Sequence, residues 1–348
     1  MLEKPKLKDH IIQSQVMNEY NLSIAKLTFL PIGYDIHTAV YRVDTDDGLA
    51  YFLKLRLGDF DPITVAIPHF LSNLGIHAII APLQTINDQL FGRYPDYTLI
   101  LYPFVTGKDG YEVRLEEHHW VELGATLNKV HAAEIPADLI PIISRESYNP
   151  AWREWVTQFQ AQVEEETFAD PVAEELSTFM KMKRQAISQM VRRADELAQE
   201  LSQNTQDLVL CHSDAHPGNF LIANSGKLYL VNWDNPILAP RERDLMFFGS
   251  GMAGAQPGGW EERSFYQGYG AIEVDPKALA YYRYERIIED IAEFCKQLLL
   301  TSEGGDDREQ AYTYLTSSFE PGGVVEAAWR TNQQLAGGQY DNTNRQNR

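Results

Sequence analysis

The sequence contains only two cysteines, Cys211 and Cys295, among 348 residues. A disulfide framework is therefore not expected, and reduced thiols fit a cytoplasmic setting. Neither cysteine belongs to a metal-ligand spacing. Apolar runs stay well below the ~20 residues that cross a bilayer, and no apolar signal core follows the first residues. We therefore expect a cytoplasmic protein without a membrane segment.

Basic residues are scarce, because 30 Lys and Arg stand against 49 Asp and Glu, which gives a net charge of −19. A field of this sign repels nucleic acid and anionic membranes, so neither is an expected partner. Residues 1–105 carry a net charge of −3, which leaves −16 for the other 243 residues. The acidic second part would attract a cationic small molecule, although acidity also simply keeps a protein in solution.

The composition, with 44% apolar and 11% aromatic residues, is that of a folded protein. Short β-rich runs dominate the first part, and Asp46-Asp47-Gly48 predicts a hairpin turn between two of them. Asp61-Pro62 is typical of a helix start, and this helix is expected to end near Gly75. A first helix is expected over 7–20, and strands are expected at 24–30, 38–44, 50–57, 78–82, 89–94 and 97–105.

After a predicted linker at 106–110 the pattern becomes mainly helical, and one β-rich stretch at 207–231 interrupts it. The tail from Gly337 is rich in Gly, Gln and Asn and is predicted to be disordered. This order indicates an α+β fold with a small β-rich part and a larger helical part. Helices are expected over 114–132, 150–168, 171–203, 241–249, 276–301 and 323–335.

The strongest functional signal is the run from Cys211 to Asn219, which reads CHSDAHPGN between two predicted strands. Phosphoryl transfer needs a carboxylate that orients the attacking hydroxyl, and oxygen ligands for magnesium. Asp214 suits the first role, and Asn219, five residues on, suits the second. The alternative is a polar turn that only its own hydrogen bonds stabilise, but polar clusters on the loops of rigid scaffolds are usually functional.

This run resembles the catalytic loop of the aminoglycoside phosphotransferase and choline kinase superfamily, and the resemblance covers roughly residues 15–335. The segment 51–55 (YFLKL) resembles the family's third-strand lysine motif, and 102–105 (YPFV) resembles its hinge. The stretches 238–247 (LAPRERDLMF) and 281–290 (YYRYERIIED) are most similar to the spectinomycin phosphotransferase branch. The resemblance therefore implies a two-lobed protein-kinase-like fold.

The same resemblance implies an enzyme that uses ATP and Mg²⁺ to phosphorylate a hydroxyl of a small molecule. It assigns Asp214, with His212 of the same motif, to catalysis. The lobes are expected at 1–105 for the nucleotide and 106–336 for catalysis and substrate, followed by the tail 337–348. A cationic antibiotic is the expected substrate, with choline- or homoserine-type metabolites as the alternative.

Lys54 is the one charged residue in the apolar and aromatic strand from Ala50 to Leu55. A lysine there would bind the α- and β-phosphates of ATP, whereas a lysine on an edge strand would only face water. The segment between the first two strands holds Gly33 and Asp35, where a phosphate-binding loop is expected. With a single glycine this loop departs from a glycine-rich pattern.

At the hinge, adenine would bind main-chain atoms, with the carbonyl of Pro103 as acceptor and the N–H of Val105 as donor. Proline has no N–H, so Pro103 agrees with this pattern, although an ordinary core strand would look similar.

Two features depart from the family pattern. No glutamate occurs between Glu19 and Glu112, so the acid that pairs with Lys54 is not identified. In addition, Asn232 stands where the family places a metal-binding aspartate, and Asp234 follows two residues later. Either Asp234 and Asn219 bind the metal, or the enzyme is weak, or the chain is a pseudokinase-like nucleotide-binding module.

Other polar residues have both a functional and a structural interpretation. His216 would contact phosphate or substrate, or stabilise the loop. Glu285 and Glu289 are four apart on one helix face and would hold a cationic substrate, although a solvated helix face is the common explanation. His131 is expected to be structural, and Asp244 is expected to fix the catalytic loop through main-chain hydrogen bonds.

Overall fold

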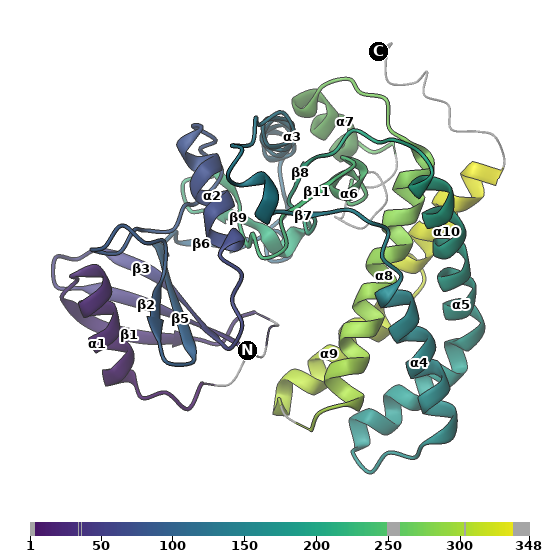
Figure 1. Cartoon of the computed structure of the whole chain (residues 1–348), viewed down its shortest axis with the longest axis horizontal. Helices are drawn as coiled ribbons and strands as arrows, with labels where there is room; N and C mark the ends of the chain where they lie inside the picture. Colours follow the sequence, from purple (N-terminus) through teal and green to yellow (C-terminus); the bar gives the residue numbers. More distant parts are fainter. Residues whose placement is uncertain (1–3, 34, 36, 249–257, 303, 337–348) are drawn as a thin grey trace. The chain divides into compact units, whose positions relative to one another are not determined.

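The computed structural model describes residues 4–33, 35, 37–248, 258–302 and 304–336. The tail from Gly337, which the sequence predicts to be disordered, lies outside these residues. The chain forms two compact units (Figure 1). The first unit comprises Met1–Arg114 and Gly218–Pro236, and the second comprises Leu115–Pro217 and Ile237–Arg348. The border between them falls within the predicted catalytic loop.

The first unit is built on a five-stranded antiparallel sheet with the order β1-β2-β3-β5-β4. Ile12, Val16 and Tyr20 recur at intervals of four residues on α1, so they form one apolar face that packs on the buried side chains of the sheet (Figure 1). The elements are α1 (Asp9–Tyr20), β1 (Ile24–Leu30), β2 (Thr38–Thr45), β3 (Ala50–Leu57), α2 (Ile63–Asn73), β4 (Gly92–Tyr94) and β5 (Tyr97–Pro103).

Two predictions in this unit are wrong. Residues 78–82 form turns and irregular structure instead of a strand, since Pro82 has no N–H to donate. Residues 106–110 are not a linker, because β6 (Gly107–Asp109) pairs with β9 (Phe220–Ala223), which pairs in turn with β10 (Leu228–Leu230). A Cβ on Gly107 would lie 2.3 Å from the carbonyl oxygen of Ile222, so this close pairing requires glycine.

The second unit is mainly helical, which confirms the predicted α+β class with its β-rich N-terminal region. Its three short strands form a sheet with the order β7-β11-β8. The elements are α3 (Glu117–His131), β7 (Ser144–Arg145), α4 (Ala151–Glu165), α5 (Pro171–Ser202), β8 (Val209–Cys211), β11 (Ile237–Ala239), α6 (Glu242–Leu245), α7 (Trp260–Tyr269), α8 (Pro276–Leu299), α9 (Gly305–Ser317) and α10 (Val324–Ala336). None of the helices in the described part of the chain has the length and apolarity of a bilayer span.

Long helices supply most of the core of this unit. The helices α4, α5 and α8 pack on one another through apolar stripes, and α3 packs closely against α7 (Figure 1). A Cβ on Gly124 of α3 would lie 2.0 Å from the carbonyl oxygen of Phe265, so glycine permits this contact. The helix expected over 241–249 is shorter, with α6 ending at Leu245 and residue 249 lying outside the described residues.

Candidate active site

In the first unit, Lys54 forms an ion pair with Asp234. Its Nζ lies 2.7 Å from each carboxylate oxygen of Asp234 and 3.2 Å from Oδ1 of Asn232. The Lys54 side chain is 14% exposed, so the interior position on β3 shields the ammonium group without sealing it from water. The lysine therefore does not simply face water, and the acid that the sequence left unidentified is Asp234.

The segment after β10 changes direction at Asn232. This residue has φ = 66°, in the left-handed region that asparagine tolerates better than most residues. The strand pattern therefore ends before Asn232, and the side chains of Asn232 and Asp234 both contact the same amine. Asn219 is buried, and its carbonyl accepts the N–H of Val231 at 3.0 Å, which ties the end of the predicted catalytic loop to this segment.

The donor set of this group suits magnesium. Asn219 and Asn232 carry amide oxygens and Asp234 carries a carboxylate, and oxygen ligands of this kind are those that Mg²⁺ prefers. The nearby Lys54 ammonium supplies a positive charge of the kind that binds phosphate. The residues therefore fit a magnesium–phosphate group in their chemistry, and their assignment as metal ligands stays a prediction.

Asp35 stabilises the turn that leads into β2. Its carboxylate accepts the N–H of His37 at 2.8 Å and the hydroxyl of Thr38 at 2.6 Å. Burial alone would raise the pKa of Asp35, but these hydrogen bonds and Arg56 lower it below its ordinary value. Gly33 has φ = 89°, which favours glycine. The structure thus gives both residues a role in the turn, and nucleotide binding by them stays a prediction.

The predicted hinge lies at the end of β5. Pro103 is its last residue and pairs with Tyr51, and the next N–H, that of Phe104, is donated to the carbonyl of Ala50 at 3.1 Å. Val105 follows and is half-buried. The arrangement leaves the assignment of Pro103 and Val105 to adenine binding as a prediction.

In the second unit, Asp214 faces Arg286 of α8. Oδ1 of Asp214 accepts a hydrogen bond from Nη1 of Arg286 at 2.6 Å, and Oδ2 lies 3.5 Å from Nε2 of His216. Burial alone would raise the pKa of Asp214, but Arg286, followed by His216 and His212, holds it far below its usual range. Asp214 is therefore ionised at neutral pH and can accept a hydrogen bond from a hydroxyl.

The main chain of the loop is anchored by Asp244, as predicted. The N–H of His212 donates to Oδ2 of Asp244 at 2.9 Å, and the N–H of Ser213 donates to Oδ1 at 2.6 Å. Ser213 has φ = 67°, so the anchor holds a residue in a conformation that non-glycine residues seldom adopt. The imidazole of His212 is completely buried, and its Nδ1 accepts the N–H of Asp214 at 3.2 Å.

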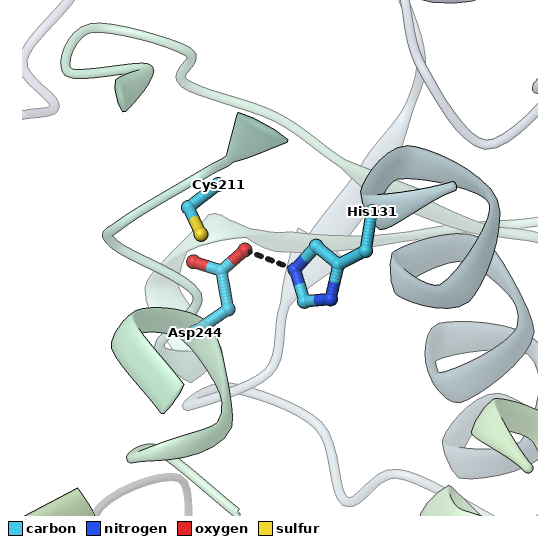
Figure 2. Close-up of side chains that lie close together, drawn as sticks. All are labelled: His131, Cys211 and Asp244. Carbon is cyan, nitrogen blue, oxygen red and sulfur yellow. Dashed lines mark hydrogen bonds and ion pairs between the residues drawn. The ribbon is translucent and has the colours of Figure 1, made fainter. Parts of the chain in front are cut away.

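His131 supports the same anchor, which confirms its structural role. Figure 2 shows its ring beside Asp244, with Nε2 3.0 Å from Oδ2, and its Nδ1 lies 2.6 Å from the hydroxyl of Tyr269. The thiol of Cys211 completes this buried group, and burial raises its pKa well above the ordinary value. Since the oxygens of Asp244 already accept three N–H groups, we interpret the group as a support for the loop and not as a metal site.

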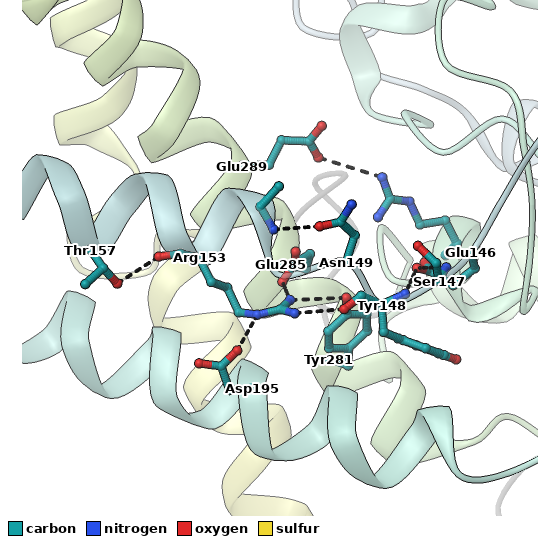
Figure 3. A network of polar contacts seen from close by, with 12 residues as sticks. Glu146, Ser147, Tyr148, Asn149, Arg153, Thr157, Asp195, Tyr281, Glu285 and Glu289 are labelled. Carbon is teal, nitrogen blue, oxygen red and sulfur yellow. Dashed lines mark hydrogen bonds and ion pairs between the residues drawn. The ribbon is translucent and has the colours of Figure 1, made fainter.

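Glu285 is buried and neutralised from within the protein. Arg153 of α4 donates to it through Nη1 and also binds Asp195 at 2.6 Å, as Figure 3 shows. Burial raises the pKa of Glu285 to about 7, although Arg153 opposes this. A side chain that is 5% exposed and already ion-paired has a clear structural role, and substrate binding by Glu285 stays a prediction.

Glu289 is more accessible than Glu285. One of its oxygens lies 3.7 Å from Nη2 of Arg243, and its side chain is 20% exposed. The next residue, Asp290, lies 3.1 Å from Nε of Arg286, and burial raises its pKa to about 6. Sequence reasoning missed Arg286 and Asp290, although their spacing of four on a helix is the usual signal of an ion pair.

The fold and these groups define a small-molecule kinase with a protein-kinase-like fold. Residues 28–282 match the phosphotransferase enzyme family, and the chain belongs to this family. No curated protein matches the sequence.

Solved structures agree with this assignment. Spectinomycin phosphotransferase in complex with ADP and spectinomycin is 34% identical, with a TM-score of 0.87, and the match covers 94% of this chain and 100% of that one. Its complex with AMP gives 33% identity and a TM-score of 0.82 over the same shares. A choline kinase from Streptococcus pneumoniae is 15% identical, with a TM-score of 0.53 over 92% of this chain and 99% of that one, and shares the fold. The predicted family and two-lobed fold are confirmed.

Proposed function

We propose that this protein is an ATP- and Mg²⁺-dependent O-phosphotransferase that acts on a hydroxyl of a small cationic molecule. The observation that carries the proposal is the group formed by Lys54, Asn232 and Asp234. The ammonium of Lys54 lies 2.7 Å from both carboxylate oxygens of Asp234 and 3.2 Å from the amide oxygen of Asn232. The solved structures of spectinomycin phosphotransferase with ADP and with AMP, which are 34% and 33% identical to this chain, support nucleotide binding by this protein.

The residues of the first unit would bind the nucleotide. Lys54 would bind the α- and β-phosphates, while Asn219, Asn232 and Asp234 would hold magnesium. When bound, magnesium neutralises charge on the phosphates. In the free protein the Asp234 carboxylate balances the Lys54 charge. We infer that this pairing keeps the lysine extended toward the phosphate position before ATP arrives.

The residues of the second unit would bind the acceptor. Asp214 would accept a hydrogen bond from the hydroxyl and orient its oxygen toward the γ-phosphorus. The bond between that phosphorus and the ADP oxygen breaks as the new O–P bond forms, and the hydroxyl proton passes to Asp214 and then to water. Because the pKa of Asp214 is strongly lowered, its main task is orientation rather than early proton removal.

An acidic side chain on α8 supports a cationic acceptor. Glu289 is 20% exposed, so its carboxylate can attract an ammonium group, whereas the neighbouring Asp290 is paired with Arg286. An aminocyclitol antibiotic such as spectinomycin, the ligand of the 34% identical relative, is our first candidate. Antibiotic resistance in the cytoplasm, where ATP is available, would then be the biological role. Choline- and homoserine-type alcohols remain the alternative acceptors.

Asn232 favours one other function, that of a nucleotide-binding module with little or no catalysis. An amide oxygen is a weaker magnesium ligand than a carboxylate because it carries no charge. Asp234 lies beside it, however, and supplies a carboxylate to the same group.

The test is Mg²⁺-dependent ATP consumption by the full chain, measured against aminocyclitols, aminoglycosides, choline and homoserine, with the phosphate located on the product by ³¹P NMR. The proposal expects a phosphate ester on a cationic acceptor and none with Asp214→Asn. Tight ATP binding without transfer to any acceptor would instead support the nucleotide-binding module.

A further inference from the structure

Three charged side chains form a row in the second unit. Asp290 contacts Nε of Arg286 through Oδ1 at 3.1 Å, and Arg286 contacts Oδ1 of Asp214 through Nη1 at 2.6 Å. Arg286 and Asp290 lie one turn apart on α8, whereas Asp214 comes from the loop after β8. One planar guanidinium therefore joins the predicted catalytic carboxylate to a rigid 24-residue helix.

This row is shielded from water more than an ordinary surface ion pair. The side chains of Arg286 and Asp214 are 21% and 16% exposed. Exposed pairs contribute little to stability, but a shielded pair with a charge-assisted hydrogen bond holds its partners in one geometry. Asp290 binds Nε of Arg286 and Asp214 binds Nη1, so two carboxylates together fix the orientation of the guanidinium plane.

Several other charged groups face the row. His212 and His216 come from the loop and both favour the ionised form of Asp214. Glu289 of α8 adds a negative charge near Arg286, while Arg243 of α6 lies 3.7 Å from Glu289 and offsets it. Arg286 therefore lies closer to the carboxylate of Asp214, at 2.6 Å, than His216 does, at 3.5 Å, and Arg286 has the larger effect on the pKa of Asp214.

We propose that Arg286 is a positioning residue for phosphoryl transfer, which holds the carboxylate of Asp214 in one orientation, and that Asp290 holds Arg286 in place. This inference rests on the proposed function, because Asp214 has a catalytic task only if transfer occurs. Arg286 fixes Oδ1 of Asp214, so the acceptor hydroxyl meets a carboxylate whose rotation is already restricted.

The test uses the full chain with Arg286→Gln, Arg286→Lys and Asp290→Asn, and kcat and KM are measured from pH 5 to 9. Arg286→Gln should lower kcat by about 10- to 100-fold with a smaller change in the KM for ATP, because a misplaced group reduces turnover by such factors. An acid limb should appear between about pH 5 and 7, since burial without a counter-charge raises a carboxyl pKa. Arg286→Lys should lower kcat without adding an acid limb, and Asp290→Asn should show a weaker form of the effect of Arg286→Gln.

Arg192→Gln is the matched control. Arg192 of α5 also precedes an acid by four residues, Glu196, but its side chain is 74% exposed, so wild-type kinetics are expected. A wild-type kcat and pH profile in Arg286→Gln would overturn the proposal. The same conclusion would follow if Arg286→Gln and Arg192→Gln were equally impaired.

A measurement without catalysis separates this proposal from the function itself. Urea unfolding of Asp214→Asn, Arg286→Gln and the double variant forms a double-mutant cycle. If the two side chains are coupled, the sum of the decreases in unfolding midpoint of the two single variants will exceed the decrease of the double variant. Additive decreases in the unfolding midpoint would refute the proposal that Arg286 fixes Asp214, even if phosphoryl transfer is observed. Coupled losses in a protein that transfers no phosphate would refute the proposed function and remove the catalytic role of Arg286, leaving only the ion pair.

Discussion

The Nζ of Lys54 lies 2.7 Å from both carboxylate oxygens of Asp234, although 180 residues separate them in the sequence. The sequence offers no glutamate between Glu19 and Glu112, and α2, the helix that follows β3, contains no acidic residue. The structure supplies the acid from the segment after β10. Asp234 is therefore both the ion-pair partner of Lys54 and one of the residues that we propose for magnesium. Its single negative charge would act on the lysine and on the metal.

Removal of the lysine tests its role in nucleotide use. We expect Lys54→Ala to lower kcat/KM for ATP on the order of 10²-fold, as the loss of one preorganised charge usually does. The free energy of unfolding should fall by about 1 kcal/mol or less, because Asp234 stays 29% exposed and can be solvated. Steady-state kinetics at varied ATP and urea unfolding measure the two effects.

Lys26→Ala provides the control for this variant. Lys26 is an exposed lysine on β1 of the same sheet, so its removal should change neither quantity. If Lys54→Ala behaved like Lys26→Ala in the kinetic assay, Lys54 would have no part in phosphate binding.

The predicted catalytic carboxylate is tested by Asp214→Ala. Loss of a positioned group that orients the hydroxyl should lower kcat by about 10²–10⁴-fold. The Kd for ATP should change by only a few fold, because Asp214 belongs to the acceptor side of the proposed reaction. Rapid-mixing kinetics and titration calorimetry give the two numbers. The exposed Asp138 of the same unit, changed to Ala, is the control, and turnover near that of wild type in Asp214→Ala would remove Asp214 from the mechanism.

The pair Arg153–Glu285 should make stability depend on pH. Burial raises the pKa of Glu285 from 4.5 to about 7, so the folded state binds this proton more tightly than the unfolded state. The stabilising contribution is therefore complete below the unfolded pKa and is lost as the pH rises through about 7. We expect Glu285→Gln to flatten this part of the pH–stability curve, which urea unfolding between pH 5 and 8 measures.

Arg153→Met gives the complementary result. It leaves Glu285 buried without its counter-charge, a change that typically costs about 3–5 kcal/mol when the group is charged. The loss should be larger at pH 8 than at pH 6, where Glu285 can take up a proton. Arg153→Met combined with Glu285→Leu should recover most of the stability. If the double variant also keeps the wild-type KM for the acceptor, Glu285 does not bind substrate.

Local patterns in the sequence were sufficient for elements that depend on their own residues. The strands at 24–30 and 50–57 were predicted with the observed bounds, and so was the turn at Asp46-Asp47-Gly48 between β2 and β3. The loop with Asp214 and Asn219 was found because its residue types and spacing are themselves the signal. Local spacing and composition carried this information without any knowledge of distant partners.

Features that depend on distant partners could not be predicted in this way. The strand β6 forms because Gly107–Asp109 pairs with Ala223–Leu221, more than a hundred residues later, and alone it has the composition of a linker. The contact between Asp214 and Arg286 joins residues 72 apart. The sequence shows Arg286 and Asp290 as an ordinary helical pair, and nothing in their spacing indicates that Asp214 is the third member.

The last prediction concerns Asn232, which stands where the family pattern has an aspartate. Its Oδ1 lies 3.2 Å from Nζ of Lys54, which Asp234 already balances, so Asn232→Asp would add one negative charge that a bound cation can neutralise. If the protein is an active kinase with a weakened metal site, this variant should raise kcat or lower the Mg²⁺ concentration for half-maximal rate, because a carboxylate holds magnesium more firmly than an amide.

A magnesium titration of wild type, Asn232→Asp and Asp234→Asn distinguishes three cases. If Asp234 already holds the metal, Asn232→Asp should change little and Asp234→Asn should be severe. If Asn232 limits the enzyme, Asn232→Asp should improve it. If the chain only binds nucleotide, neither variant will affect transfer, because there is none to change. We expect an active enzyme, since Lys54 and Asp234 are already assembled and Asp214 is held ionised. ATP binding that ignores magnesium in all three proteins, with no transfer to any cationic acceptor, would refute this expectation.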